Sequence, residues 1–124
     1  MRSPRTAFWL SLVFTLLVIA GTTLPLCNQM FHCGCNFAGA AHCNIHHATP
    51  PHCPWCAHDH RAFYLSFAAI LPFTTGAIYT VTRRRKSLLL GTLTGVAAYL
   101  IVGLLAGLIT ARTMGYGTFF GFNI

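Results

Sequence analysis

Three long stretches of this chain contain no charged side chain, and they limit what it can fold into. They are residues 7–26, 62–82 and 87–110. Each contains the roughly 20 apolar residues that an α-helix needs to cross a hydrocarbon layer about 30 Å thick. Because 55% of the residues are hydrophobic and only 7% are charged, a soluble fold would have little polar surface to cover three such helices. The sequence therefore predicts an all-α integral membrane protein with three transmembrane helices.

The basic residues predict how these helices are oriented. Two arginines precede the first stretch, and residues 83–86 form a basic link between the second and the third. Only Arg61 and Arg112 lie at the opposite helix ends. Since basic residues favour the cytoplasmic side, we expect a cytoplasmic N-terminus in the cell membrane and an extracytoplasmic segment at 27–60, periplasmic in a bacterium. The net charge of +7 is explained in the same way and does not indicate a nucleic-acid partner.

The expected organisation of the chain follows from these boundaries. It comprises a cytoplasmic tail and first transmembrane helix at 1–26, an extracytoplasmic loop at 27–60, a second helix at 61–82, a cytoplasmic basic turn at 83–86, a third helix at 87–111, and an extracytoplasmic aromatic tail at 112–124. Pro25 is expected to end the first helix, and Asp59 to cap the second. The start also resembles a signal sequence, but its apolar run is longer than a signal core, so we expect a retained anchor.

Every cysteine and every histidine of the chain lies in residues 27–60. This segment holds six cysteines and seven histidines, and a His-Cys pair recurs every 10 residues, as His32-Cys33, His42-Cys43 and His52-Cys53. Thiolate and imidazole are ligands for zinc, copper and iron. A segment this small cannot bury a core of its own, and such segments depend on metals or disulfides. We therefore expect a small irregular Cys/His-rich loop that folds around a metal ion.

The spacing of these residues suggests which of them bind the metal. A C-x-x-H or C-x-x-C pair brings two ligands onto one turn, and two such pairs complete a tetrahedral site. The first set of candidate ligands is Cys43, His46, Cys53 and Cys56. A second set is His42, His52, Cys33 and Cys35, and with two metals the other site would comprise Cys27, Cys33, Cys35 and His32. Zinc is the expected metal for a structural site, and copper or an iron–sulfur cluster for a redox site.

Other interpretations of the loop stay open at this point. The six cysteines can form a disulfide framework, whose connectivity has about fifteen alternatives and cannot be deduced from sequence. Alternatively, Cys53 and Cys56 form a C-x-x-C dithiol, which would make the protein a membrane thiol–disulfide oxidoreductase that exchanges electrons with a quinone or a partner protein. A metal-uptake or sensing protein would use the same ligands with exchangeable binding.

A stripe of small residues in the third stretch predicts close helix packing. Gly91, Gly95, Gly103 and Gly107 are separated by multiples of four, with Tyr99 between the two GxxxG units. Small residues at this spacing allow helix backbones to approach each other in lipid, so the partner is the first helix or a helix of another protein. The tail at 112–124, rich in aromatic residues and glycine, is expected to lie along the membrane surface or to dock onto a partner.

The remaining sequence excludes several classes of function. The three apolar stretches have no ionisable acid or base for a proton relay or ion pathway, so a pump or secondary transporter is not expected. Asp59 is the only carboxylate side chain, which rules out catalysis by paired carboxylates. We therefore expect a non-catalytic accessory or electron-transfer subunit of a membrane redox complex, bound to other membrane or periplasmic subunits. If it is an enzyme, we expect an oxidoreductase.

Overall fold

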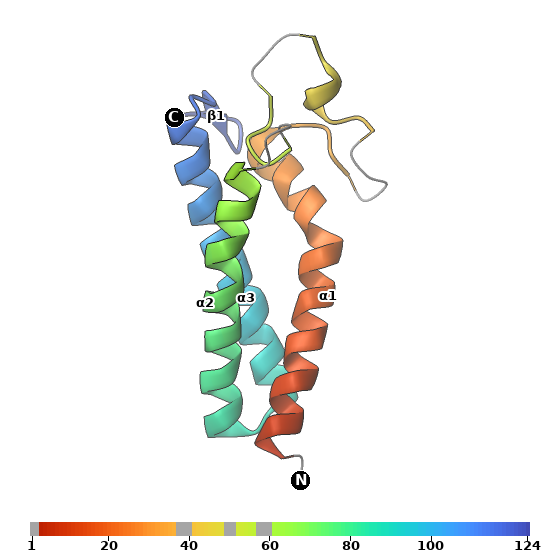
Figure 1. Cartoon of the computed structure of the whole chain (residues 1–124), viewed down its shortest axis with the longest axis vertical. Helices are drawn as coiled ribbons and strands as arrows, with labels where there is room; N and C mark the ends of the chain where they lie inside the picture. Colours follow the sequence, from red (N-terminus) through yellow and green to blue (C-terminus); the bar gives the residue numbers. More distant parts are fainter. Residues whose placement is uncertain (1–2, 37–40, 49–51, 57–60) are drawn as a thin grey trace. The chain divides into compact units, whose positions relative to one another are not determined.

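The computed structural model describes residues 3–36, 41–48, 52–56 and 61–124 (Figure 1). Three helices dominate it: α1 (Pro4–Phe31), α2 (Arg61–Arg85) and α3 (Leu88–Thr113). A short 3-10 helix, η1 (Asn44–His46), and two short strands, β1 (Thr118–Phe119) and β2 (Phe122–Asn123), complete it. The expectation of three helices long and apolar enough to span a membrane is confirmed. The expected helix cap, Asp59, lies outside the described residues.

The first helix is longer than the sequence suggested. We expected Pro25 to end it, and this was wrong, because α1 continues through Pro25 to Phe31. A proline inside a helix costs about 3 kcal/mol, but the last turn buries Met30 and Phe31, which are 0% and 1% exposed. Such burial contributes about 1.5 to 3 kcal/mol for each side chain, enough to offset the proline. As a consequence, Cys27 is a helical residue and not a loop residue.

The basic turn is shorter than the predicted one. Residues 83–85 are the last turn of α2, and only Lys86 and Ser87 connect it to α3. Lys86 has a positive φ of 52°, a left-handed conformation that reverses the chain after a helix. Cationic side chains in the last turn of α2 also interact favourably with the negative end of its helix dipole.

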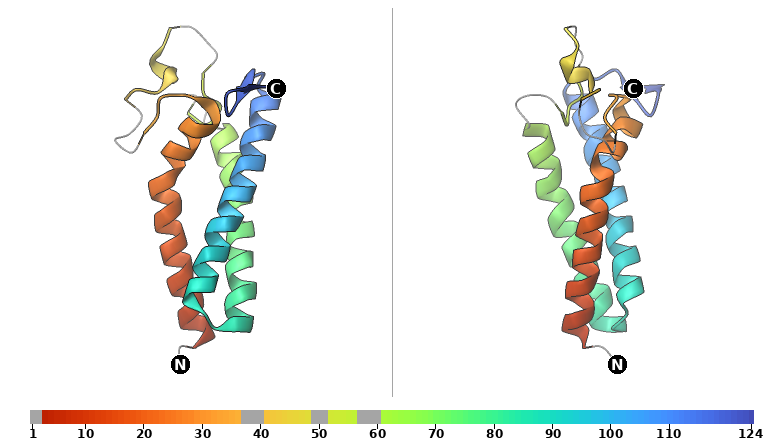
Figure 2. Two further views of the ribbon diagram at one scale, coloured as in Figure 1. Left: turned by 180° about the vertical axis from the view of Figure 1, so that it is seen from behind. Right: turned by 90° about the vertical axis from the view of Figure 1, so that its right-hand side faces the viewer.

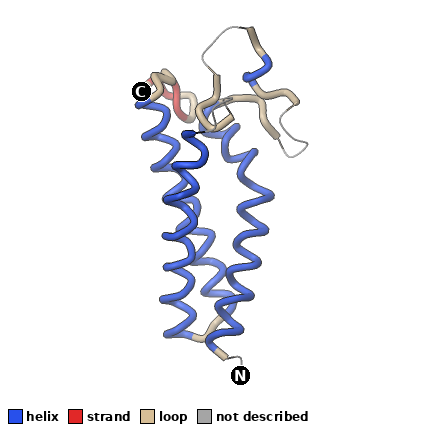
Figure 3. The backbone as a smooth tube through the Cα atoms, in the orientation of Figure 1, coloured by secondary structure: helices blue, strands red, loops and turns tan. Residues whose placement is uncertain are grey.

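The chain forms two compact units, and each of the three long helices runs from one into the other. Unit 1 consists of Met1–Ala20 and Ala68–Gly103, and unit 2 of Gly21–Phe67 and Leu104–Ile124. Unit 1 contains the α2–α3 turn, which lies beside the start of α1 in both views of Figure 2. Unit 2 contains the cysteine-rich loop, which is drawn mostly as irregular chain in Figure 3.

In unit 1, the helices bury every fourth residue, and most of these residues are small. The buried positions are Ala7, Ser11, Thr15 and Ile19 on α1, Ile70, Thr74, Ile78 and Thr82 on α2, and Gly91, Gly95, Tyr99 and Gly103 on α3. A Cβ atom added at Gly91 would lie 2.5 Å from Ser11 Oγ and 2.6 Å from Thr82 Cγ2. Gly91 therefore allows α3 to approach α1 and α2 of the same chain closely.

In unit 2, the C-terminal tail docks onto the end of α1. The tail forms an antiparallel pair of strands, β1 and β2. The Tyr116 hydroxyl donates a hydrogen bond to the Phe31 carbonyl oxygen (2.8 Å), and the Phe120 N–H donates to the Met30 carbonyl oxygen (2.8 Å). The last carbonyls of a helix have no partner within the helix. The tail supplies partners for two of them and so fixes the end of α1, next to Cys27.

Candidate metal centre

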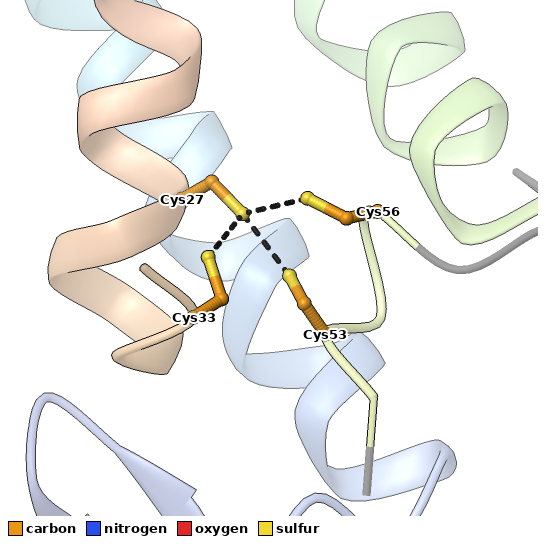
Figure 4. A group of neighbouring side chains, drawn as sticks. All are labelled: Cys27, Cys33, Cys53 and Cys56. Atoms are coloured by element: carbon orange, nitrogen blue, oxygen red, sulfur yellow. Dashed lines mark hydrogen bonds between the residues drawn. The ribbon is translucent and has the colours of Figure 1, made fainter. Parts of the chain in front are cut away.

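Four cysteine sulfurs meet in unit 2 (Figure 4). Cys27 Sγ lies 3.4 Å from Cys33 Sγ, 3.1 Å from Cys53 Sγ and 3.5 Å from Cys56 Sγ. All four sulfurs lie within 4.8 Å of one another. Cys27, Cys33 and Cys53 are at most 1% exposed, and Cys56 is half-buried. We call these residues the four-cysteine cluster.

The dimensions of the four-cysteine cluster fit a metal ion after a small expansion. Zinc binds thiolates at about 2.3 Å, so the sulfurs of a tetrahedral site are about 3.8 Å apart. The distances from Cys27 Sγ, 3.1 to 3.5 Å, are a few tenths of an ångström shorter. A bound ion would move the sulfurs outward by that amount, which flexible cysteine side chains permit. Four thiolates are soft ligands that select zinc, copper(I) or iron.

The first half of the cluster is built by a sharp reversal of the chain after α1. Cys27 lies in the second-to-last turn of the helix, and Cys33 follows its end. Between them, His32 has a φ of 49°, and Gly34 after Cys33 has a φ of 82°. A Cβ atom at Gly34 would overlap the His42 carbonyl oxygen. Glycine is therefore required here both for its backbone conformation and for the close contact with His42.

The second half of the cluster is a tight turn. The Cys56 N–H donates a hydrogen bond to the Cys53 carbonyl oxygen (3.1 Å), which closes the C-x-x-C segment. Pro54 stands at the second position of this turn, where its fixed φ is favourable. The two thiols are thereby presented from one side of the chain toward Cys27, as Figure 4 shows.

Two asparagines that belong to no motif in the sequence hold these segments in place. Asn28 Oδ1 accepts a hydrogen bond from the Gly34 N–H (2.8 Å). The Asn44 N–H donates to the Cys33 carbonyl oxygen (2.7 Å), its Oδ1 accepts from the Cys53 N–H (2.9 Å), and its Nδ2 donates to the Tyr116 hydroxyl (3.1 Å). Asn44 thus joins both halves of the cluster to the C-terminal tail.

The other two cysteines form a disulfide between Cys35 and Cys43. This disulfide lies against the cluster, because Cys35 Sγ is 3.3 Å from both Cys33 Sγ and Cys56 Sγ. The sulfurs of Cys33, Cys35, Cys43 and Cys56 consequently form a second group in which all four lie within 4.8 Å of one another. Both cysteines of the disulfide are fully buried.

Hydrogen bonding among the thiols favours the thiolate form, which a metal requires, at Cys33 and Cys56 but not at Cys53. Hydrogen bonding with Cys27 lowers the pKa of Cys53, but hydrogen bonding with Cys33 and Cys56 together with burial outweighs this, so that its pKa is raised. The pKa of the Cys33 thiol is held well below its usual range, chiefly by hydrogen bonding with the Cys27 side chain, although burial opposes this. The pKa of Cys56 is lowered as well, again mainly by hydrogen bonding with Cys27. A thiolate stabilised by neighbouring S–H groups is a ready ligand.

Aromatic side chains pack around the C-x-x-C segment of the cluster. Trp55, between the two cysteines of the C-x-x-C segment, is 2% exposed. Its ring contacts those of Phe31, Phe63 and Phe67 edge-on, at centroid distances of 6.0, 6.4 and 6.1 Å. Burial of the Tyr116 hydroxyl nearby raises its pKa. Such an apolar shell keeps water away from a metal–thiolate centre and stabilises it.

The structure does not bring together the first set of ligands that the spacing suggested. Cys53 and Cys56 lie in the four-cysteine cluster, whereas Cys43 is bonded to Cys35. His46 is exposed on η1 and belongs to neither cysteine group, and no described histidine does. His32 and His42 are exposed, while His52 Nδ1 is hydrogen-bonded to the Asn44 carbonyl oxygen (3.1 Å).

The arrangement supports two kinds of chemistry. As thiolates, the four clustered cysteines can hold a metal ion; as thiols, the close pair Cys27 and Cys53 can oxidise to a disulfide. No family model, curated protein or solved structure matches this chain. The function proposed below therefore depends on the geometry of the described residues.

Proposed function

We propose that this chain is an integral membrane protein whose extracytoplasmic four-cysteine cluster binds one metal ion, zinc in the first place. The observation that supports this most strongly is the convergence of four sulfurs from two segments, Cys27 to Cys33 and Cys53 to Cys56, within 4.8 Å. Three of these cysteines are fully buried and Cys56 is half-buried. Crowding of thiols adds little to the stability of a protein when the thiols bind no metal and form no disulfide. A metal ion would explain why they converge.

The ligand number indicates a structural rather than a catalytic site. Four thiolates fill the tetrahedral positions of zinc and leave no open position for water or substrate. The same four cysteines could hold iron, in which case the centre would transfer electrons. We therefore propose an accessory subunit of a membrane complex, with electron transfer as the alternative if the metal is redox-active.

Thiol–disulfide exchange at Cys53 and Cys56 is the weaker candidate. Cys53 is 0% exposed, and an attacking thiolate must reach the sulfur of its substrate. Trp55, between Cys53 and Cys56, is also buried and packs against Phe31 and Phe63. The burial that suits a metal site thus argues against a reactive dithiol.

The apolar helix surfaces support a place in the membrane. Large hydrophobic side chains are exposed along all three helices, among them Leu17 at 64%, Phe73 at 67% and Ile101 at 60%. Water would make such exposure costly, whereas lipid would not. The basic residues at 83–86 favour a cytoplasmic α2–α3 turn and hence an extracytoplasmic cluster. Lys86 is the only lysine, so its modification by a membrane-impermeant amine reagent applied from outside the cell would contradict this orientation.

Metal content of two variants tests the proposed site. The Cys56→Ser variant, purified in detergent, should lose the metal or bind it at least about tenfold more weakly, because three thiolates and a hydroxyl replace four thiolates. The His46→Ala variant is the matched control and should keep one ion per chain. Elemental analysis and titration with a chromogenic chelator measure both. Metal retained by Cys56→Ser but lost from His46→Ala would overturn the four-cysteine site.

A further inference from the structure

The six cysteines form two groups of four that share two members. The first group is Cys27, Cys33, Cys53 and Cys56, and the second is Cys33, Cys35, Cys43 and Cys56. Two tetrahedral metal sites that share an edge have this pattern: two bridging thiolates and two terminal thiolates on each ion. Cys33 and Cys56 occupy the bridging positions. Cys27 and Cys53 are then terminal on one side, and Cys35 and Cys43 on the other.

The disulfide between Cys35 and Cys43 keeps the second group from binding a metal ion. Sulfurs bonded to each other are not thiolates and do not ligate as such. We propose that reduction of this disulfide opens a second metal site, so that the loop holds one divalent ion when oxidised and two when reduced. This inference rests on the proposed metal site and adds to it a response to the redox state.

The second group does not depend on the disulfide for its assembly. The Asn44 N–H donates to the Cys33 carbonyl oxygen at 2.7 Å, which ties the residue after Cys43 to the segment that carries Cys35. Gly34 packs directly against the backbone of His42, which adds a second contact between the same two segments. These contacts remain when the sulfur–sulfur bond is broken. The two thiols therefore stay beside Cys33 and Cys56.

The distances among the sulfurs also favour a shared cluster. Cys35 Sγ lies 3.3 Å from Cys33 Sγ and 3.3 Å from Cys56 Sγ, the same range that separates the sulfurs of the first group. A site of four thiolates and one divalent ion has the same formal charge as a cluster of six thiolates and two divalent ions. The second ion therefore adds no net charge to a buried region, which removes the main electrostatic objection to it.

The chemistry of the step is balanced with a dithiol as reductant. The dithiol transfers two electrons and two protons to the Cys35–Cys43 disulfide and becomes a disulfide itself. The two thiols formed then lose their protons to solvent as they bind the incoming ion, together with the bridging thiolates. Both sulfurs are buried, so we expect reduction to require opening of the loop and to be slow.

Native mass spectrometry of the detergent-solubilised full chain, loaded with Zn²⁺, tests the inference. The oxidised protein should carry one zinc ion, and the protein fully reduced by excess dithiothreitol without oxygen should carry two. The Cys35→Ser/Cys43→Ser variant should carry one ion under both conditions. A His42→Ala/His46→Ala variant, which leaves all cysteines in place, should still gain the second ion on reduction.

The possible outcomes separate this inference from the proposed function. One ion in both redox states of the natural sequence would overturn the second site and leave the first intact. No ion in either state would overturn both. A second ion that survives in Cys35→Ser/Cys43→Ser, or that is lost from His42→Ala/His46→Ala, would place it on other ligands and contradict the assignment.

Discussion

At the scale of single residues, the geometry of the site depends on two residues that are not themselves metal ligands. Gly34 permits the reversal after Cys33, since its φ is 82° and the His42 carbonyl occupies the space of a side chain. Asn44 binds the Cys33 carbonyl, the Cys53 N–H and the Tyr116 hydroxyl. Gly34 and Asn44 hold the backbone that carries the cysteines in place, so their loss should weaken metal binding without removing a ligand.

The Gly34→Ala variant tests how much Gly34 contributes to the stability of the protein. A left-handed φ costs a non-glycine residue about 1 to 2 kcal/mol, and overlap with the His42 backbone should add about 1 to 3 kcal/mol. Gly115→Ala is the control, because Gly115 has a φ of 66° and no atom within 4 Å of the Cβ position. We expect Gly34→Ala to lower the free energy of unfolding, measured by chemical denaturation in detergent, clearly more than Gly115→Ala. Equal losses would contradict the close contact at Gly34.

The ligand residues show how far sequence alone could lead. The composition of the sequence identified the loop and all six cysteines as the candidate metal ligands, because no other segment contains a cysteine or a histidine. Spacing, however, favoured His46 and Cys43 over Cys27 and Cys33. Local spacing shows only which residues share a turn. Which cysteines join Cys53 and Cys56 in the cluster depends instead on where α1 ends. That end depends on burial of Met30 and Phe31 and on hydrogen bonds from the tail, which are long-range contacts.

At the scale of elements, the three helices pack through small residues at a spacing of four. Gly91 and Gly95 lie against side chains of both α1 and α2, with Thr15 Oγ1 2.6 Å from the Cβ position of Gly95. The glycine stripe in the sequence predicted the first helix, or a helix of another protein, as its partner. It did not predict the contact with α2 or identify Ser11, Thr15 and Thr82, because single hydroxyl side chains in an apolar segment form no recognisable pattern. In lipid, the hydrophobic effect contributes little to the association of helices. Close backbone contact therefore contributes most of the packing energy.

The Gly91→Ala variant tests this packing. A methyl group there would lie 3.0 Å from Ser11 Cβ and closer still to Ser11 Oγ, so α1 and α3 must separate. We expect a loss of about 1 to 3 kcal/mol in the free energy of unfolding, followed by helical circular dichroism. Gly76→Ala on α2, where nothing lies within 4 Å, should be neutral or stabilising by up to about 1 kcal/mol, as alanine favours helices. A similar loss in both variants would contradict the proposed contact.

At the scale of the whole molecule, the two units are stabilised in different ways. Unit 1 (Met1–Ala20 and Ala68–Gly103) is held by helix packing, which needs only the apolar sequence and small residues. Unit 2 (Gly21–Phe67 and Leu104–Ile124) contains irregular chain, and its described contacts converge on the cysteine sulfurs and the aromatic residues around them. Metal binding is therefore expected to contribute to the folding of unit 2 directly.

X-ray absorption at the zinc edge of the oxidised, zinc-loaded protein tests the central claim most directly. Four thiolate ligands predict a single shell of four sulfurs at about 2.3 Å, with no nitrogen shell at about 2.0 to 2.1 Å. A mixed sulfur and nitrogen shell would show that histidines complete the site and would contradict the four-cysteine cluster.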